Sequence, residues 1–326
     1  MIPLAKRYRR RLPLGEATPI VSLGEGSTPL LPARRLSERL GVELWLKWEG
    51  ANPTGSFKDR GMTVAVSRAA AAGARAVVCA STGNTAASAA AYGARAGLLA
   101  VILQPAGAVA LGKVAQARAV GARLLEVQGS FEQALEAARE LERRGTHVLV
   151  NSLNPDRLEG QKTAAFELVE DLGGAPDVLA LPYGGGGNTR AYALGFEEAG
   201  AGMPRLLAGE ASARAGTVAT AIRIVEPAHR GEAEAAVARS GGSVVPLGDD
   251  ELLAAWRDLA RLEGVFCEPA SAAGVAAVAK KPPEPGSRVV CVVTGHGLKD
   301  PEAAARLADA PVSVAPDVDA IAEAAA

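Results

Sequence analysis

Short apolar runs alternate with longer helical patterns along most of the chain. The runs expected to be strands begin near residues 43, 76, 99, 123, 147, 177, 243 and 288. Most stretches between them are rich in alanine, place apolar residues at three- and four-residue steps and end in glycine, which is the pattern of amphipathic helices. Strands that alternate with helices in this way form parallel sheets, so the sequence predicts an α/β fold.

Four apolar runs end in small polar or glycine residues just before the next helix. These junctions lie at 79–84, 150–155, 182–188 and 293–297. In open α/β sheets, ligands bind outside the carboxyl ends of the strands. The four junctions are therefore where we expect the chemistry of the protein.

Some segments fall outside this alternation. Residues 280–287 (KKPPEPGS) are the expected linker, because prolines cannot continue a helix. Residues 209–217 are expected to be a loop, and the tail after Pro311 to be a loosely attached arm that ends in a short helix. The basic block from Lys6 to Arg11 is interpreted as a solvated terminal helix, since it lacks the features of a targeting segment.

The composition favours a small-molecule partner. The 326 residues are 48% hydrophobic, enough for a large core in two domains or in one elaborate α/β unit. Lys plus Arg (35) nearly balance Asp plus Glu (36), and no long basic tract interleaves with aromatic residues, which argues against nucleic acid as the main partner. No apolar run approaches the ~18 residues that a membrane span requires, so no membrane partner is expected.

The cysteines and histidines predict neither disulfides nor a metal site. Cys79, Cys267 and Cys291 are far apart and flanked by apolar residues, which suits buried, reduced thiols in a cytoplasmic protein. The three histidines do not have the spacing of metal ligands.

The stretch NPTGSFKDRG, residues 52–61, places a lysine at an apparent helix start. Asn52, Pro53 and Gly55 mark a turn, Ser56 is a plausible N-cap, and Lys58 then falls in the first helical turn. The positive end of the helix dipole disfavours the ammonium form, so Lys58 is either a nucleophilic amine or an ordinary solvated charge. Asp59 and Arg60 are expected to be ordinary helix surface.

The glycine run Gly184–Gly187, followed by Asn188, lies between an expected strand and an expected helix. Successive backbone N–H groups at a helix N-terminus can form a cradle for a phosphate. A tight turn without a ligand is the alternative, but a shorter turn would have sufficed, and we favour the phosphate. The spacing matches neither a dinucleotide fingerprint nor a Walker loop.

Three other junctions leave their alternatives open. Residues 81–85 (STGNT) offer hydroxyls and an amide that suit a ligand carboxylate or phosphate, although such residues also cap helices. Arg157, with Asn151 and Ser152, could bind an anion through its planar fork, or could lie on an ordinary surface turn. His296 stands between two glycines, which imply that some group approaches the backbone closely.

An amine at a helix start, a glycine cradle and several hydroxyl and amide junctions together describe a site for pyridoxal phosphate. Along nearly its whole length the chain also resembles the threonine synthases, which are fold-type-II pyridoxal-phosphate enzymes related to the tryptophan synthase β chain. GSFKDRG at 55 is typical of the wider fold type. In contrast, NSLNPDRLEGQKT at 151 and TGHGLKDP at 294 resemble the threonine synthases in particular. The other similar stretches are EGSTPL at 25, CASTGNTAASAAAY at 79, ATAIRI at 219 and FCEPASAA at 266.

This resemblance implies two open, twisted, mainly parallel sheets flanked by helices, with the active site between two domains. Residues 1–50 and 151–326 would form a large cofactor-binding domain. Residues 51–150, approximately, would form a smaller α/β domain that carries Lys58 and the 81–85 loop. The family also suggests a homodimer.

The resemblance also implies roles for individual residues. Lys58 would be the Schiff-base lysine and the catalytic base, Asn84 would contact the cofactor O3′, and Thr294 would face the pyridine nitrogen. Two anion sites would coexist. The cofactor phosphate would meet Gly184, Gly185, Gly186, Gly187 and Asn188, and the substrate phosphate would meet Ser81, Thr85, Asn151, Ser152 and Arg157.

The implied reaction converts O-phospho-L-homoserine and water to L-threonine and phosphate, the last step of threonine biosynthesis, and makes the protein a carbon–oxygen lyase acting on phosphates. In this scheme Lys58 moves protons at the substrate's α- and β-carbons, and the released phosphate stays near Arg157. One alternative is a related enzyme that performs elimination on serine or threonine, or β-replacement on another amino acid; the anion-binding residues around Arg157 argue against a dehydratase. The other is a non-catalytic protein that binds pyridoxal phosphate.

The chain departs from the family pattern in two places. GGGGN at 184 stands where the family usually has a mixed loop such as GNAGN, so the backbone donors remain but a side-chain amide at Gly185 is lost. The stretch 204–224, expected to be a loop between sheet and helix, is shorter than in the family, in keeping with the tolerance of loops for deletions.

Overall fold

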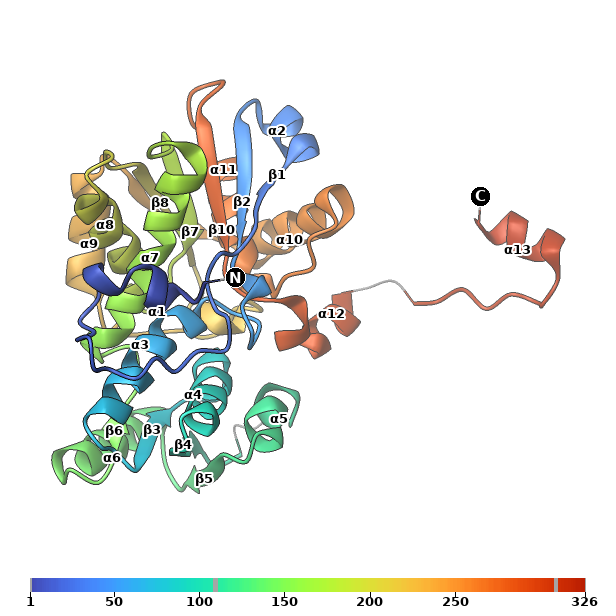
Figure 1. Cartoon of the computed structure of the whole chain (residues 1–326). Helices are drawn as coiled ribbons and strands as arrows, with labels where there is room; N and C mark the ends of the chain where they lie inside the picture. Colours follow the sequence, from blue (N-terminus) through green and yellow to red (C-terminus); the bar gives the residue numbers. More distant parts are fainter. Residues whose placement is uncertain (1, 108–110, 308–309, 326) are drawn as a thin grey trace.

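The computed structural model describes residues 2–107, 111–307 and 310–325, and its strands form two sheets (Figure 1). The larger sheet has six strands in the order β1-β2-β10-β7-β8-β9, and the smaller has four in the order β5-β4-β3-β6. The strands are β1 Leu30–Pro32, β2 Glu43–Trp48, β3 Ala76–Ala80, β4 Leu99–Pro105, β5 Arg123–Val127, β6 Val148–Leu149, β7 Val178–Pro182, β8 Arg205–Ala211, β9 Ser243–Leu247 and β10 Arg288–Val293.

Helices cover both sheets, and short 3-10 turns follow several strands. The α-helices are α1 Leu4–Arg7, α2 Arg34–Leu40, α3 Lys58–Ala71, α4 Asn84–Arg95, α5 Leu111–Ala119, α6 Phe131–Arg143, α7 Pro155–Leu172, α8 Gly187–Ala199, α9 Arg230–Arg239, α10 Asp249–Glu263, α11 Ala273–Lys280, α12 Pro301–Leu307 and α13 Val318–Ala325. The 3-10 turns are η1 Arg9–Arg11, η2 Glu49–Ala51, η3 Thr220–Ile222, η4 Pro269–Ala272 and η5 Gly297–Lys299.

The sheets are mainly parallel, as the sequence predicts. The pairing of β1 with β2 is antiparallel, and the other strand pairs in the two sheets are parallel. Each apolar run expected to be a strand is one. Strand β7 is buried along its whole length, since helices cover both faces of its sheet, and such strands read as continuous apolar runs rather than as alternating patterns.

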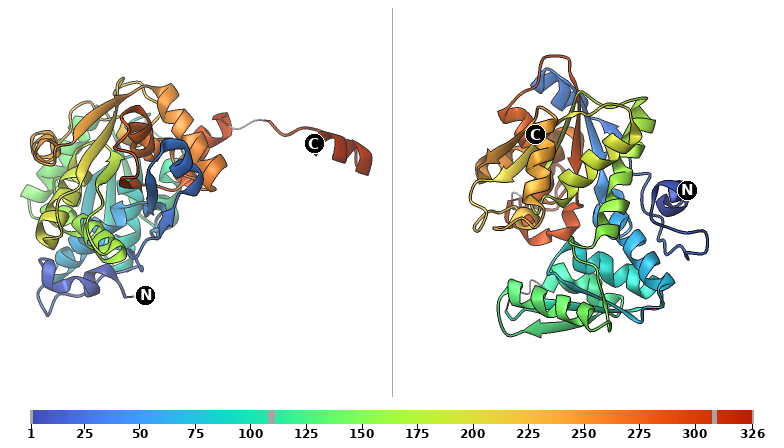
Figure 2. Two further views of the ribbon diagram at one scale, coloured as in Figure 1. Left: turned by 90° about the horizontal axis from the view of Figure 1, so that it is seen from above. Right: turned by 90° about the vertical axis from the view of Figure 1, so that its left-hand side faces the viewer.

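In the sequence, the strands of the smaller sheet lie between β2 and β7, two strands of the larger sheet. The chain leaves the larger sheet after β2, builds β3 to β6, and returns through α7 to β7. Figures 1 and 2 show the four-stranded sheet with α4, α5 and α6 on one side of the molecule and the six-stranded sheet on the other. The expected domain boundaries near residues 50 and 150 follow this insertion and stay a prediction.

The two connections between the sheets, α3 and α7, pack tightly against each other. Glycines allow this approach: a Cβ on Gly160 would lie 1.9 Å from Arg60 O, and a Cβ on Gly61 would lie 2.6 Å from Arg157 O. Both crossing helices are therefore held at backbone contact distance near their first turns.

Three expectations about local structure need correction. The stretch 204–224 does not form one loop, because its first part is strand β8, which also takes the first residues of the expected loop at 209–217. Gly209 lies inside β8 because a Cβ there would lie 2.4 Å from Ala273 O on the covering helix α11. Residues 280–287 join α11 to β10 of one sheet rather than linking two domains.

The two ends of the chain differ in how they attach. The basic N-terminal block is only partly solvated, because α1 buries Leu4 against Val64 and Phe166 while Arg7 forms an ion pair with Glu170. The C-terminal arm agrees with its prediction: α13 has no buried residue and lies away from the body of the molecule (Figure 1).

The cysteines are buried and free, as expected. Among the described residues, no helix is both long and apolar enough to cross a membrane. Within the same ranges, no group of three or more His, Cys, Asp or Glu residues could hold a metal ion.

Candidate active site

Lys58 lies in the first turn of α3, as the sequence predicts, and is the first residue of that helix because Phe57 rather than Ser56 occupies the N-cap position. Its side chain is partly accessible, which leaves a path for a ligand, but protein atoms surround the amine closely. Burial, and to a smaller extent repulsion from Arg157, lower the pKa of Lys58 to about 7, and the Glu268 carboxylate partly opposes both effects. Much of this amine is therefore neutral near pH 7 and able to act as a nucleophile.

Asp59 is not helix surface, contrary to the sequence interpretation, but is completely buried. Its carboxylate accepts hydrogen bonds from Thr54 N at 2.7 Å, Thr54 Oγ1 at 2.6 Å and Ser88 Oγ at 2.6 Å. Burial raises the pKa of Asp59 to about 6, and these hydrogen bonds act against that rise. The bonds fix the turn that precedes Lys58 against α4.

Arg60, also expected at the surface, is buried at the centre of an ionic network. Its Nε donates to Glu49 Oε2 at 2.7 Å and its Nη2 to Glu167 Oε2 at 2.6 Å. Lys47 adds a second cation 3.0 Å from Glu167. The network joins α3 to β2 and α7, so Arg60 ties the helix that carries Lys58 to the larger sheet.

The glycine loop follows β7 and leads into α8, as predicted. Gly186 has a left-handed φ of 81°, and a Cβ there would lie 2.8 Å from His229 O. Asn188 Nδ2 and Thr189 Oγ1 are buried without a hydrogen-bond partner among the residues that the structure describes. Open backbone N–H groups at a helix start and an unpaired amide nitrogen suit a phosphate.

Thr294, at the end of β10, lies beside the loop that leads to Lys58. Its carbonyl oxygen accepts from Phe57 N at 3.0 Å, and the next residue, Gly295, forms a bridge with Ser56. The Thr294 hydroxyl is 2.9 Å from Ser271 Oγ. The Thr294 and Lys58 loops, far apart in the sequence, are thus directly connected.

Asn84 is the first residue of α4, and its Nδ2 donates to Glu268 Oε1 at 2.9 Å. Glu268 is a buried residue to which the sequence analysis gave no role, although it lies in the stretch FCEPASAA. Burial raises the pKa of Glu268 to about 7, and the hydrogen bond from Asn84 acts against this rise. A Cβ on Gly295 would lie 2.2 Å from Glu268 Oε1, so this carboxylate is the close neighbour that a glycine beside His296 implies.

Arg157 is completely buried in the first turn of α7, not on a surface turn. Its Nη1 donates to Val150 O at 2.8 Å, whereas Nε and Nη2 have no partner in the part of the chain that the structure describes. Burial lowers the pKa of Arg157 to about 10 despite the opposing influence of Cys79 and Asp59. A buried guanidinium with two unpaired nitrogens suits an anionic ligand.

The other residues expected at the substrate phosphate lie in the segments that follow β3 and β6. Ser81 Oγ accepts from Gly83 N at 3.2 Å and from Ala86 N at 3.3 Å. Thr85 is the second residue of α4 and is partly buried.

The loop after β6 brings Asn151 and Ser152 to the same edge. The Asn151 side chain pairs with the backbone of Ala80 in both directions, each bond 2.9 Å long, and so ties β6 to β3 while one amide N–H remains for a ligand. Ser152 O accepts from His229 Nε2 at 2.8 Å. The sequence analysis gave no role to His229, which lies in a stretch without a recognisable motif.

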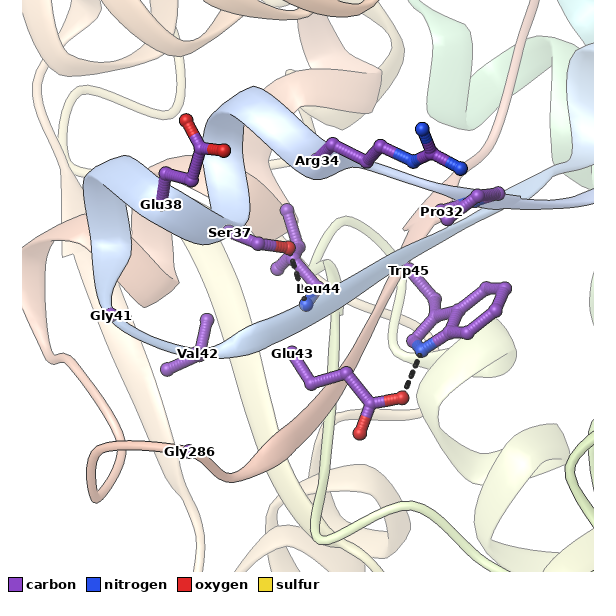
Figure 3. Close-up of a pocket in the computed structure, with 10 residues that line it drawn as sticks. All are labelled: Pro32, Arg34, Ser37, Glu38, Gly41, Val42, Glu43, Leu44, Trp45 and Gly286. Atoms are coloured by element: carbon purple, nitrogen blue, oxygen red, sulfur yellow. Dashed lines mark hydrogen bonds between the residues drawn. The ribbon is translucent and has the colours of Figure 1, made fainter.

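The hollow shown in Figure 3, about 600 Å³ in volume, is a different place. It lies beside Val42, Glu43 and Gly286, at the amino ends of β2 and β10. Ligands of parallel sheets bind at the carboxyl ends of the strands, where the residues described above lie. We therefore assign no role to this hollow.

Comparison with known proteins gives consistent findings. A family profile described as "Pyridoxal-phosphate dependent enzyme" matches residues 21–295. The chain is 49% identical over 333 residues to a threonine synthase of Halalkalibacterium halodurans, covering 96% of this chain and 94% of that one. It is 50% identical over 330 residues to a threonine synthase of Mycobacterium tuberculosis, covering 95% and 91%. The solved cysteine synthase of Entamoeba histolytica shares the fold with a TM-score of 0.75 at 22% identity, covering 88% and 90%.

Proposed function

Because the chain belongs to the pyridoxal-phosphate-dependent enzyme family, we propose that it is a threonine synthase, which converts O-phospho-L-homoserine and water to L-threonine and phosphate. The observation that carries the proposal is the buried guanidinium of Arg157, whose Nε and Nη2 lack partners in the described chain. This cation is close enough to Lys58 to lower the pKa of that amine. A substrate whose phosphate binds Arg157 would bring its carbon skeleton to Lys58.

The residues present fit pyridoxal phosphate. Lys58 offers an amine with a pKa of about 7, and the glycine loop offers helix-start N–H groups and the unpaired Nδ2 of Asn188. Asn84 would meet the ring hydroxyl, and Thr294 would offer a neutral hydroxyl to the ring nitrogen. When bound, the cofactor supplies an electron sink that stabilises negative charge developing on the carbons of an amino-acid substrate.

Lys58 is suited to moving the protons of this reaction. A general base works best when its pKa lies near the working pH, and burial brings the pKa of Lys58 to about 7. The network around Arg60 and the Asp59 hydrogen bonds hold the start of α3 in place. The amine therefore takes and returns protons at the substrate carbons from a fixed position.

Arg157 would bind and orient the substrate phosphate through Nε and Nη2, with help from Ser81, Thr85, Asn151 and Ser152. Once the carbon–oxygen bond breaks, the same contacts would keep the leaving phosphate beside the reacting carbons, where it can accept a proton from the attacking water. Holding the two reactants together favours water addition over release of an unsaturated product.

The direct test supplies the purified holoenzyme with O-phospho-L-homoserine and measures phosphate and threonine. We expect the two products in equal amounts. Ammonia and a keto acid without threonine would instead identify an eliminating enzyme. Absence of turnover, together with a cofactor absorption band that disappears in Lys58→Ala, would identify a non-catalytic cofactor-binding protein.

We also propose that the enzyme is a cytoplasmic homodimer. The three buried, free cysteines suit a reducing compartment. The resemblance to the threonine synthases favours the dimer. Sedimentation velocity of the holoenzyme tests whether it is a dimer, and a monomer at micromolar concentration would contradict the proposal.

A further inference from the structure

His229 is a buried residue just before α9, and it contacts both of the loops expected to bind phosphate. Its backbone N donates to Gly185 O at 3.0 Å, and its ring Nε2 lies 2.8 Å from Ser152 O. A carbonyl oxygen only accepts, so Nε2 carries the proton. Nδ1 is then the acceptor for Arg190 Nη1 at 3.4 Å.

These contacts connect loops that belong to different sheets. The glycine loop follows β7 of the six-stranded sheet, whereas Ser152 follows β6 of the four-stranded sheet. The packing is close on the glycine side, because a Cβ on Gly186 would lie 2.8 Å from His229 O and a Cβ on Gly187 would lie 3.2 Å from His229 Cδ2. A shift of the glycine loop would therefore press on the backbone of His229 at Gly186 and on its ring at Gly187.

We propose that His229 is a positioning residue that couples the two phosphate loops, so that filling the glycine loop with the cofactor phosphate orders the Ser152 loop for the substrate phosphate. The proposal rests on the proposed function, because it takes the second loop to be a substrate-phosphate site. His229 needs to touch neither phosphate.

The chemistry of the ring suits this task. Imidazole is rigid, and few rotatable bonds separate the His229 backbone, which is bonded to Gly185, from the ring nitrogen that meets Ser152. A displacement of the His229 backbone is therefore passed on to Ser152. Arg190 holds the ring in the tautomer that donates to Ser152, and Glu232 holds Arg190 through an ion pair of 3.3 Å.

Hydrogen–deuterium exchange tests the coupling without any turnover. In the wild type, pyridoxal phosphate added to the cofactor-free chain should slow exchange both at residues 184–189 and at residues 152–156. In His229→Ala, the protection should persist at 184–189 and disappear at 152–156. Protection that persists at both loops would overturn the proposal, as would its equal loss at both loops in a variant that still binds the cofactor.

His229→Gln provides the matched variant, because the amide nitrogen of glutamine can replace Nε2 as a donor to Ser152 O, whereas His229→Asn is too short. We expect His229→Gln to restore protection at 152–156 and His229→Asn not to. If His229→Ala fails to bind the cofactor, exchange at 152–156 is compared between His229→Gln and His229→Asn instead. Equal behaviour of these two variants would overturn the proposal.

Steady-state kinetics then test whether the loss of His229 weakens substrate binding. His229→Ala should raise the KM for O-phospho-L-homoserine and the inhibition constant for inorganic phosphate roughly 5-fold, the loss expected for one hydrogen bond, with kcat changed much less. His147→Ala, a change at a partly exposed histidine just before β6, is the control and should alter neither constant. A fall in kcat at unchanged KM would contradict the assignment. If the wild type does not turn over this substrate, the proposed function fails while the exchange experiment still decides the coupling.

Discussion

Two buried arginines, Arg60 and Arg157, allow a structural charge to be distinguished from a charge kept for a ligand. Their exposed fractions are 1% and 0%. Arg60 is paired with Glu49 and Glu167. The Arg157 guanidinium donates to Val150 O, and its Nε and Nη2 lack partners in the described ranges. Replacing each with methionine, which is apolar and flexible enough to fill the space, should therefore affect stability very differently at the two positions.

We expect Arg157→Met to leave the stability of the ligand-free protein nearly unchanged. Burial lowers the pKa of Arg157 to about 10, which corresponds to a cost on the order of 3 kcal/mol for holding the charged form in the fold. Methionine removes this cost but leaves Val150 O without its donor, which costs about 1–3 kcal/mol. The two contributions oppose each other, so the free energy of unfolding should change by less than about 2 kcal/mol.

Arg60→Met is the matched control. Its removal leaves Glu49 and Glu167 buried beside too little positive charge, and breaking a buried ion pair in this way costs about 3–5 kcal/mol. Urea unfolding of the cofactor-free proteins, followed by circular dichroism, measures both changes.

Phosphate binding to the holoenzyme completes the test, because the cofactor already occupies the glycine loop there. Inorganic phosphate should stabilise wild-type holoenzyme by mass action and should not stabilise Arg157→Met, which should also lose phosphate release from the substrate. The reasoning is refuted if Arg157→Met destabilises the protein as much as Arg60→Met does, or if it keeps its stabilisation by phosphate.

Three further predictions follow from the site. Recombination of the cofactor-free protein with pyridoxal phosphate should accelerate as the pH rises through about 7, because burial lowers the pKa of Lys58 to about 7 and only the neutral amine attacks; stopped-flow absorbance measures this, and a flat profile across neutral pH would contradict it. Asn84→Ala should weaken cofactor binding roughly 10-fold in fluorescence titrations, whereas Glu268→Gln, which keeps an oxygen for Asn84, should change it much less; equal losses would show that the negative charge matters more than the hydrogen bond. Gly295→Ala should destabilise the protein by about 1–3 kcal/mol in urea unfolding, because the new Cβ would lie 2.2 Å from Glu268 Oε1; Gly174→Ala, where a Cβ meets open space, is the control, and similar values for both would refute the close-contact explanation.

The fold was largely predictable from the sequence because its central strands are covered on both faces. Such strands appear as unbroken apolar runs, and β7 and β10 were evident for that reason. Strand β8 was missed because Gly209 and Glu210 resemble loop residues, although the glycine is there for contact with Ala273 on α11. That requirement comes from packing between distant segments, which a local pattern does not contain.

The site was predictable where its chemistry depends on local sequence, and not where it depends on partners far along the chain. The helix start at Lys58 and the glycine loop are local features. Asp59 and Arg60 were wrongly assigned to the surface because charged residues are rarely buried unless paired, and the pairing acid Glu167 lies far away in the sequence. Glu268 and His229 were missed for the same reason, since their hydrogen bonds reach Asn84 and Ser152 across the fold.

The crossing of α3 and α7 has a consequence for motion. These helices are the two passages between the sheets, and glycines hold them in backbone contact at the end where Lys58 and Arg157 stand. In a rigid-body rotation, atoms close to the rotation axis move least. If one sheet rotates against the other about this crossing, the loop at 81–85 would be displaced much further than the Lys58 amine and the Arg157 guanidinium, whose separation would hardly change. The protein could then open to admit a substrate and close over it without resetting the distance between the two groups on which the proposed reaction depends.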